Sequence, residues 1–276
     1  MNFGILIHMQ RLFKYLKNIL FPVPALHVAI DIGDKRNKTI VLLHGIAATS
    51  KTWDLLVAEL GSSKYHIVGL DLLGFGQSPK PTDYDYNVGD HVALVHKTLK
   101  KLKIRRPFVI VGHSMGAIIS AHYYTKYPSD IKEMFILSPP LYLDDDSQTI
   151  IARKRTDLYL DAYKFLAEKK DFTISNSQLI RKILLVKDGI DVNQDNWDGF
   201  RLSLMNTIIK QNTFKELCGV KIPVQIVYGS LDQLLIQESV NKLAVYKNIE
   251  ISKLSGVDHT IGKRFAVEVA RMINNK

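Results

Sequence analysis

Short runs of β-branched and aliphatic residues recur along the 276-residue chain, and segments with helical spacing separate them. Most of these runs are apolar on both faces and end at Gly, Pro, Ser or Asp, which is typical of buried parallel strands. Strands that alternate with helices predict an α/β fold with a mostly parallel central sheet and helices on both faces. The strand-like runs are 39–45, 65–71, 108–114, 134–140, 224–230 and 249–256, and the helix-like segments are 86–102, 116–127 and 263–273.

One long interval interrupts this alternation. From Leu141 to about Phe214 the sequence has helical spacing and no strand signal. An insertion of this kind between two strands predicts a helical cap over one end of the sheet, at the strand ends where open α/β sheets bind ligands. The helix-like segments of the interval are 149–170, 176–186 and 196–211. The expected units are a core of 23–140 and 215–276 and a cap of 141–214.

The run 108–114 leads directly into Gly112-His113-Ser114-Met115-Gly116, which fits the pattern G-x-S-x-G between a strand and a helix. In that setting a sharp, strained turn lifts the serine above the sheet, and the two glycines remove side chains that would collide. Two alternatives are a tight turn in which the serine has no catalytic role and a loop that binds phosphate. The flanking strand and helix, together with partner residues downstream, favour Ser114 as a nucleophile.

A serine hydroxyl needs a base that is itself oriented by a carboxylate. In α/β folds with this turn, the chain order is serine, acid, histidine. His259 is the histidine that follows the last strand-like run, so we expect it to be the base. His44 and His113 lie in motif turns, and the remaining histidines lie where packing is the simpler role.

The acid is expected just past a strand end between the serine and the histidine. Asp232 has that position, in "VYGSLDQLL". Asp144, in "LYLDDD" after the preceding strand, is the competing candidate. Asp258 is too near His259 in sequence to reach its ring easily.

Two backbone donors would stabilise the oxyanion that develops during attack on a carbonyl. The Met115 N–H lies at the start of the helix that follows the serine. The loop after the run 39–45, where His44-Gly45 turns the chain, offers the N–H of Ile46.

The motifs "LLHGIAATSKTW", "VGLDLLGFGQSPKP", "VGHSMG", "IPVQIVYGSLD" and "VDHT" follow one another in the order found in α/β-hydrolases. The chain resembles the capped, cofactor-free serine members of that family from about residue 39 to its end. The resemblance implies the α/β-hydrolase fold, a cap after the sixth strand, Ser114, Asp232 and His259 as a triad, and no cofactor or metal. Ser114 argues against haloalkane dehalogenases and epoxide hydrolases, which have an aspartate at this turn.

These residues predict a serine hydrolase that transfers an acyl group from a small-molecule carboxylic ester to water, as a carboxylesterase does. One alternative is a carbon–carbon bond hydrolase acting on a ring-cleavage diketone, which would need polar cap groups. Another is a ligand receptor that keeps the triad without turnover. Candidate polar cap groups are Arg153, Arg155, Arg181 and Arg201.

The formal net charge is +10, but Lys and Arg are scattered without a recognisable nucleic-acid-binding module, so no nucleic acid partner is expected. Cys218, the single cysteine, excludes an internal disulfide and fits a reducing compartment. No apolar run reaches the roughly 18 residues of a membrane-spanning helix. Because signal-peptide order is also missing, we expect a cytoplasmic protein, free or attached peripherally to a membrane.

Residues 1–22 precede the part that carries the family resemblance. Their apolar residues recur with helical spacing and alternate with basic or amide ones, which predicts a basic amphipathic helix. Such a helix lies in a membrane interface or packs on the core or on a second subunit, and both alternatives stay open. The apolar positions are Met9, Leu12, Phe13, Leu16, Ile19 and Leu20.

Overall fold

The computed structural model describes residues 23–143, 148–183 and 192–275. The amphipathic helix predicted for residues 1–22 and the alternative acid Asp144 lie outside these residues. Within the described ranges, no helix has both the length and the apolar character needed to cross a membrane.

Seven strands form one sheet in the order β1-β3-β2-β4-β5-β6-β7. Every neighbouring pair is parallel except β1 and β3, so the predicted mostly parallel sheet is confirmed. The strands are β1 Val28–Ile32, β2 Lys38–Leu43, β3 Tyr65–Leu70, β4 Phe108–His113, β5 Ile131–Leu137, β6 Val224–Gly229 and β7 Ile249–Leu254.

The register of the central strands places their carboxyl ends along one edge. Leu43 at the end of β2 pairs with Gly112 in β4, and His113 pairs with Leu137 at the end of β5. Leu137 in turn pairs with Val227 in β6. The loops that leave β2, β4 and β6 therefore start side by side, although they are far apart in the sequence.

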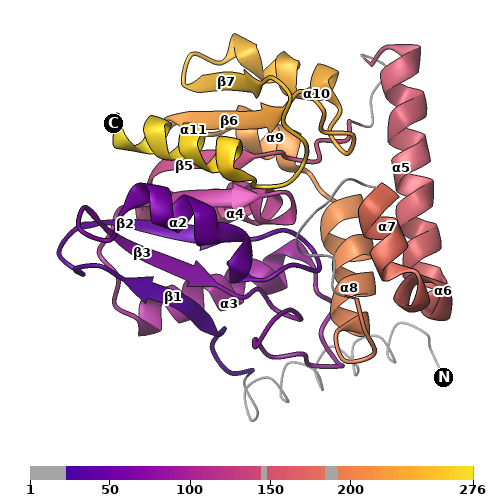
Figure 1. The fold of residues 1–276 in the computed structure, drawn as a ribbon, viewed down its shortest axis with the longest axis horizontal. Helices are drawn as coiled ribbons and strands as arrows, with labels where there is room; N and C mark the ends of the chain where they lie inside the picture. The colour runs from indigo at the N-terminus through magenta and orange to yellow at the C-terminus, as the bar shows by residue number, and fades with distance from the viewer. Residues whose placement is uncertain (1–22, 144–147, 184–191, 276) are drawn as a thin grey trace, which may run out of the picture.

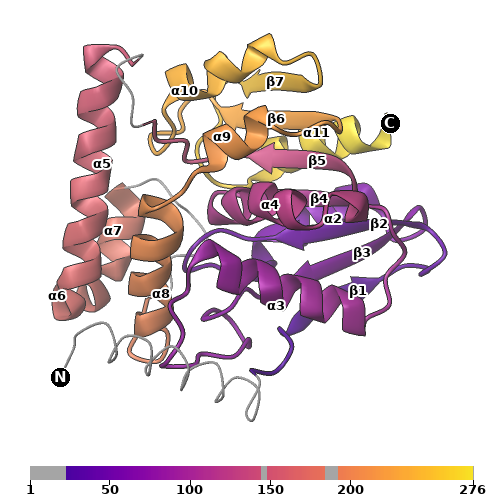
Figure 2. The ribbon, with the colours of Figure 1, turned by 180° about the vertical axis from the view of Figure 1, so that it is seen from behind.

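Helices cover both faces of the sheet, as predicted (Figures 1 and 2). On one face lie α2 (Asp54–Leu60) and α11 (Lys263–Asn274), and on the other lie α3 (Val88–Lys101), α4 (Met115–Lys126) and α9 (Thr213–Cys218). Because strand side chains alternate, Ile40 and Leu42 pack toward α2 and α11 while Val41 and Leu43 pack toward the opposite face. The shorter elements are η1 Ser50–Trp53, η2 Pro128–Asp130, α10 Gln237–Asn241 and η4 Lys242–Val245.

Local sequence determines where α3 begins. The Asn87 side chain accepts from the Asp90 N–H at 3.0 Å, and the Asp90 carboxylate accepts from the Asn87 N–H at 3.4 Å. This reciprocal pair satisfies backbone donors that have no partner within the helix.

Between β5 and β6 the chain forms the helices of the insertion, which gather at one side of the core (Figure 1). They are α5 Ile150–Glu168, α6 Lys170–Ser175, α7 Ser177–Ile183, α8 Trp197–Ser203 and the π-helical segment η3 Leu204–Ile209. In the described residues the insertion follows the fifth strand, whereas the family resemblance implied a position after a sixth. The difference arises because β1 alone precedes β2 in this part of the chain.

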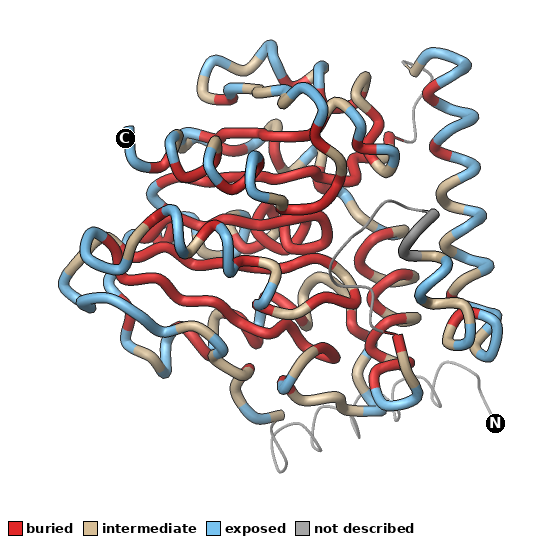
Figure 3. Tube along the Cα trace, viewed as in Figure 1, coloured by how far each residue is buried: buried red, intermediate tan, exposed pale blue. Residues whose placement is uncertain are grey.

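The most buried residues of the long helix α5 are small, and its outer face carries large apolar ones. Ala152, Thr156 and Ala167 are buried against the molecule. Leu158 and Phe165 are 65% and 45% exposed, and the outer side of α5 is the side coloured as exposed in Figure 3. Tyr163 and Leu166 also point inward from α5 and line the pocket described below.

Candidate active site

Ser114 occupies the turn between β4 and α4 in a strained backbone conformation. Its φ is 53° and its ψ is −116°, a region that side-chain-bearing residues rarely adopt. The turn is held because the Ser114 N–H donates to the Leu137 carbonyl at 2.9 Å. Gly116 permits the close packing that follows, since a Cβ at that position would lie 2.0 Å from the Leu43 carbonyl oxygen. The sequence pattern G-x-S-x-G thus forms the strained strand-to-helix turn expected of it.

The structure brings His259 and Asp232 together. The His259 Nδ1 atom lies 2.9 Å and 2.8 Å from the two carboxylate oxygens of Asp232. Because a carboxylate only accepts hydrogen bonds, Nδ1 is the donor, and Nε2 is the ring nitrogen left to accept a proton. His259 lies in the loop after β7, and Asp232 lies in the loop after β6.

Asp232 is 3% exposed and is held as a carboxylate. Burial alone would raise the pKa of Asp232, but the charge and the hydrogen bond of His259 outweigh burial and lower that pKa below its ordinary value. The N–H of Leu234 adds a hydrogen bond to Asp232 Oδ1 at 3.0 Å. Asp258, by contrast, accepts from the N–H of Thr260.

His113, the residue before the serine, joins the serine turn to the loop of the histidine. Its Nε2 atom donates to the His259 carbonyl at 2.8 Å, and the two rings lie 4.8 Å apart. Burial, followed by the nearby charge of His259, lowers the pKa of His113 to about 3, so this ring stays neutral. Trp53 is fully buried with its ring edge-on to His113. The sequence places His113 in a turn but does not reveal its bond to His259.

The loop after β2 lies against the serine turn. A Cβ on Gly45 would lie 3.2 Å from the Ser114 Cβ, and Ile46 lines the same pocket as Ser114 and His259. Ala47 continues the loop with a φ of 53°. Met115 is the first residue of α4, where the geometry of a helix leaves backbone N–H groups without intrahelical acceptors. Both predicted oxyanion donors therefore belong to segments beside Ser114.

His44 fixes the path of that loop. Its Nδ1 atom donates to the Gly45 carbonyl at 2.7 Å, and its Nε2 atom accepts from the Leu72 N–H at 2.9 Å. Burial lowers the pKa of His44 to about 4, which keeps the ring neutral and able to accept on one side. Asp71 supports the same region by accepting from the N–H groups of Ser50 and Gln77.

A largely apolar pocket opens above Ser114 between the core and the insertion, with a volume of about 940 Å³ including its solvent-open part. Phe200, Leu204 and Ile208 line it from α8 and η3, at a spacing that puts them on one helical face. The other apolar wall residues include Ile46, Pro140, Leu166, Ile180, Val192, Leu234 and Ile261. Tyr163 also faces the pocket and shares a 2.9 Å hydrogen bond with Tyr142.

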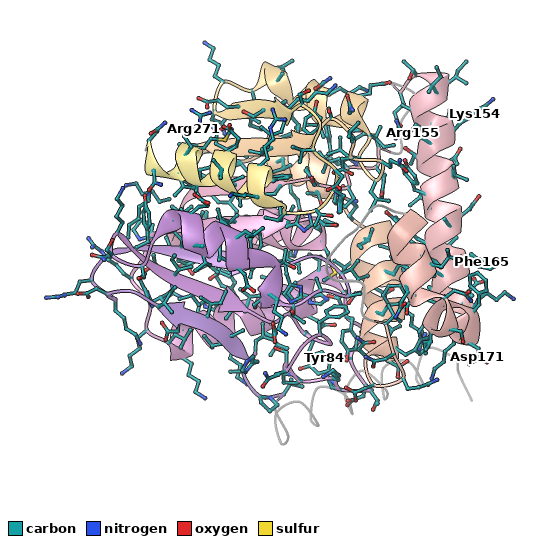
Figure 4. All side chains as sticks on the ribbon, in the orientation of Figure 1. Tyr84, Lys154, Arg155, Phe165, Asp171 and Arg271 are labelled. Carbon is teal, nitrogen blue, oxygen red and sulfur yellow. The ribbon has the colours of Figure 1, made fainter. Side chains whose placement is uncertain are left out.

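The arginines considered for a polar cap site lie elsewhere where the structure describes their side chains. Arg153 is exposed, Arg155 donates to the Gln233 carbonyl, and Arg201 pairs with Asp198 at 3.0 Å. Figure 4 shows Arg155 directed toward the loop after β6, and Lys154 and Phe165 on the outer side of α5. The side chain of Arg181 is outside the described part of the chain.

Comparisons with known proteins agree with this architecture. The chain is 24% identical over 267 residues to the Probable lysophospholipase BODYGUARD 4 of Arabidopsis thaliana, which covers 85% of this chain and 64% of that protein. It thus spans less than two thirds of that relative's length.

Two solved structures share the fold. An esterase from Exiguobacterium antarcticum superposes with a TM-score of 0.70 at 17% identity, covering 91% of this chain and 94% of that chain. A meta-cleavage product hydrolase from Pseudomonas fluorescens IP01 has a TM-score of 0.62 at 17% identity, covering 89% and 93%. A family model for the alpha/beta hydrolase fold matches residues 38–248, which is most of the chain. With the sheet order, the serine turn and the paired histidine and aspartate in place, the chain belongs to the alpha/beta hydrolase fold family.

Proposed function

We propose that this protein hydrolyses carboxylic esters, with Ser114 as nucleophile, His259 as general base and Asp232 as the carboxylate that orients the base. The observation that carries the proposal is the bidentate approach of Asp232 to His259 Nδ1 beside a strained serine in the same pocket. This arrangement leaves Nε2 to take the serine proton.

In the proposed reaction, Ser114 Oγ attacks the ester carbonyl as its proton passes to His259. The N–H groups of Met115 and Ile46 stabilise the negative oxygen of the tetrahedral intermediate. His259 then gives the proton to the departing alcohol, which leaves an acyl-enzyme on Ser114. Water, deprotonated by the same imidazole, releases the acid and restores the hydroxyl.

The pocket supports an apolar acyl group as the part of the substrate that it encloses. Its walls carry aliphatic and aromatic side chains, and none of the described wall residues is Lys, Arg, Asp or Glu. An acidic ring-cleavage diketone would gain no cationic partner from these walls, so ester hydrolysis is favoured over carbon–carbon bond cleavage. The similarity to a relative named as a probable lysophospholipase agrees with this choice.

The test is hydrolysis of p-nitrophenyl esters of graded chain length, measured beside a ring-cleavage diketone and with Ser114→Ala as control. We expect the wild-type protein to turn over the esters repeatedly and to prefer medium-length acyl chains to acetyl. Ser114→Ala should hydrolyse none of them. Preferential cleavage of the diketone would replace the proposal with carbon–carbon hydrolysis. Release of a single equivalent of nitrophenol followed by a stable adduct would replace it with a receptor role.

A further inference from the structure

A second cavity adjoins the apolar pocket and differs from it in chemistry. Its volume is about 510 Å³ including its solvent-open part. Three segments that are distant in sequence form it: the loop after β2, the turn that follows β3, and the segment that precedes α8. The described residues that line it are Ala47, Ala48, Thr49, Gly76, Lys80, Asn193, Asp195 and Asn196.

The two cavities meet along shared segments of chain. Ala48 lines both of them. Val192 lines the apolar pocket and its neighbour Asn193 lines the polar cavity. Ile46, which carries a proposed oxyanion donor, lies two residues before Ala48 in the same loop. An ester whose carbonyl is held at this loop would therefore have the apolar pocket on one side and the polar cavity within reach.

Lys80 is the main donor in the polar cavity. Its side chain is 23% exposed, and its ammonium group donates to the Gly76 carbonyl at 2.8 Å and lies 3.3 Å from Asp195 Oδ2. An ammonium group has three N–H donors, and these two contacts account for two of them. Within the described residues the ammonium group has no third partner, so its remaining N–H can donate to a ligand in the cavity.

The charge of the cavity favours a neutral ligand. Lys80 and Asp195 are the charged residues among its described walls, and they form an ion pair. A phosphate group would be attracted to Lys80 but repelled by the adjacent carboxylate. A hydroxyl group both accepts and donates, so it suits an ammonium and a carboxylate that lie side by side. Thr49 adds a further hydroxyl to the same wall.

We propose that this cavity is the subsite for an uncharged, hydroxyl-bearing alcohol, so that the preferred substrates are monoacyl esters of a polyol such as glycerol. The inference rests on the proposed ester hydrolysis. It assigns the acyl chain to the pocket lined by Phe200 and Leu204, and the free hydroxyls of the alcohol to Lys80 and Asp195.

The experiment compares three substrates that share one acyl chain: monooctanoylglycerol, methyl octanoate and octanoyl lysophosphatidic acid, with full-length protein and release of octanoate as the readout. We expect kcat/KM to be highest for the glycerol ester. Lys80→Met is expected to lower the ratio of kcat/KM for the glycerol ester to that for the methyl ester by about tenfold, mainly through KM, since one hydrogen bond to a charged group is lost. Lys80→Arg should restore part of that ratio.

Two further variants sharpen the result. Lys101→Met, at an exposed position at the end of α3, is the matched control and should leave the ratio at the wild-type value. Asp195→Asn should raise the relative rate on the phosphate-bearing ester, because it removes the repelling carboxylate.

Equal kcat/KM for the glycerol and methyl esters, or an equal loss on both in Lys80→Met, would overturn the subsite while leaving ester hydrolysis intact. A wild-type preference for the phosphate-bearing ester would overturn the choice of a neutral alcohol. Failure to hydrolyse any of the three would overturn the proposed function and the subsite with it.

Discussion

His113 donates a 2.8 Å hydrogen bond to the backbone carbonyl of His259, a residue 146 positions away in the chain. The bond links the turn that carries the serine to the loop that carries the proposed base. Misplacement of reacting groups by about 1 Å costs on the order of a hundredfold in rate. A single buried side chain thus tethers the two segments that carry the proposed nucleophile and the proposed base.

His113→Phe keeps the aromatic volume beside Trp53 but removes the donor. We expect kcat/KM for ester hydrolysis to fall by about tenfold to a hundredfold, with a small change in Tm. His122→Phe is the control. It removes a histidine of α4 that is bonded to Glu216 of α9, and it should keep the wild-type rate. Equal rates in the two variants would show that the link to His259 does not matter for catalysis.

Ser114→Ala should abolish ester hydrolysis and labelling by a fluorophosphonate probe. The fold should persist because alanine keeps the Cβ and so adds no strain to the φ of 53°. Circular dichroism and gel-based labelling measure the two effects. Ser129→Ala, at an exposed position in η2, should be labelled like the wild type. A labelled Ser114→Ala protein would place the nucleophile elsewhere.

Asp232→Asn should lower kcat by about 10⁴-fold, because an amide favours the wrong tautomer of His259. Steady-state kinetics at saturating ester measures the loss. Asp144→Asn tests the alternative acid and should change kcat little. If Asp144→Asn proves the more damaging change, the acid has been misassigned.

Leu204→Trp should shift substrate preference toward short acyl chains, since the larger ring would fill part of the apolar pocket. The ratio of kcat/KM for octanoyl and acetyl p-nitrophenyl esters is the measurement. We expect it to fall at least about tenfold, because several methylenes of the longer chain would no longer fit between the pocket walls. Leu158→Trp adds the same ring on the exposed face of α5 and should leave the ratio unchanged. A chain-length profile that does not move would place the acyl group outside this pocket.

Buried neutral histidines should make the fold sensitive to acid. Burial lowers the pKa of His91 to about 3, and in the unfolded chain a histidine has a pKa of about 6.5. Between these values the unfolded state binds a proton that the folded state does not. The free energy of unfolding should therefore decrease as the pH falls below about 6.5, by about 1.4 kcal/mol per pH unit for this residue.

His91→Gln should remove that share of the pH dependence, while an amide can still bond to Ser203, the present partner of the His91 ring. Urea unfolding at several pH values between about 6.5 and 4 gives the slope. The wild-type slope should exceed that of the variant by about one proton. Identical slopes would mean that His91 is protonated in the folded protein.

Much of the sheet was predictable because its central strands are buried on both faces. The runs 65–71, 108–114 and 224–230 match β3, β4 and β6 to within a residue at either end. β1 was not predicted, because it is an antiparallel edge strand whose side chains are half-buried or exposed. Such a strand lacks the continuous apolar run that identifies its neighbours.

The site was predictable where it depends on turns at strand ends, and less so where it depends on contacts across the fold. Asp232 and His259 each follow a strand, and the parallel sheet brings such positions to one edge. The acceptor of the His113 hydrogen bond is a backbone carbonyl. Because every residue has a backbone carbonyl, the sequence does not show which residue accepts this bond. The cavity around Lys80 is formed by three segments that are distant in sequence and share no motif, so it could not be predicted. The π-helical segment that begins at Leu204 also has no known sequence signal.

The insertion leaves and rejoins the sheet at two strands that are direct neighbours, since Met134 in β5 pairs with Val224 in β6. For a flexible segment, doubling the length between two fixed points costs only about 0.6 kcal/mol of closure entropy. The helices of the insertion, from α5 to η3, would therefore tolerate lengthening, trimming or exchange without altering the register of β5 and β6. A lineage built on this plan could change its substrate by altering the insertion alone, while the four loops proposed to carry the chemistry, after β2, β4, β6 and β7, stay the same.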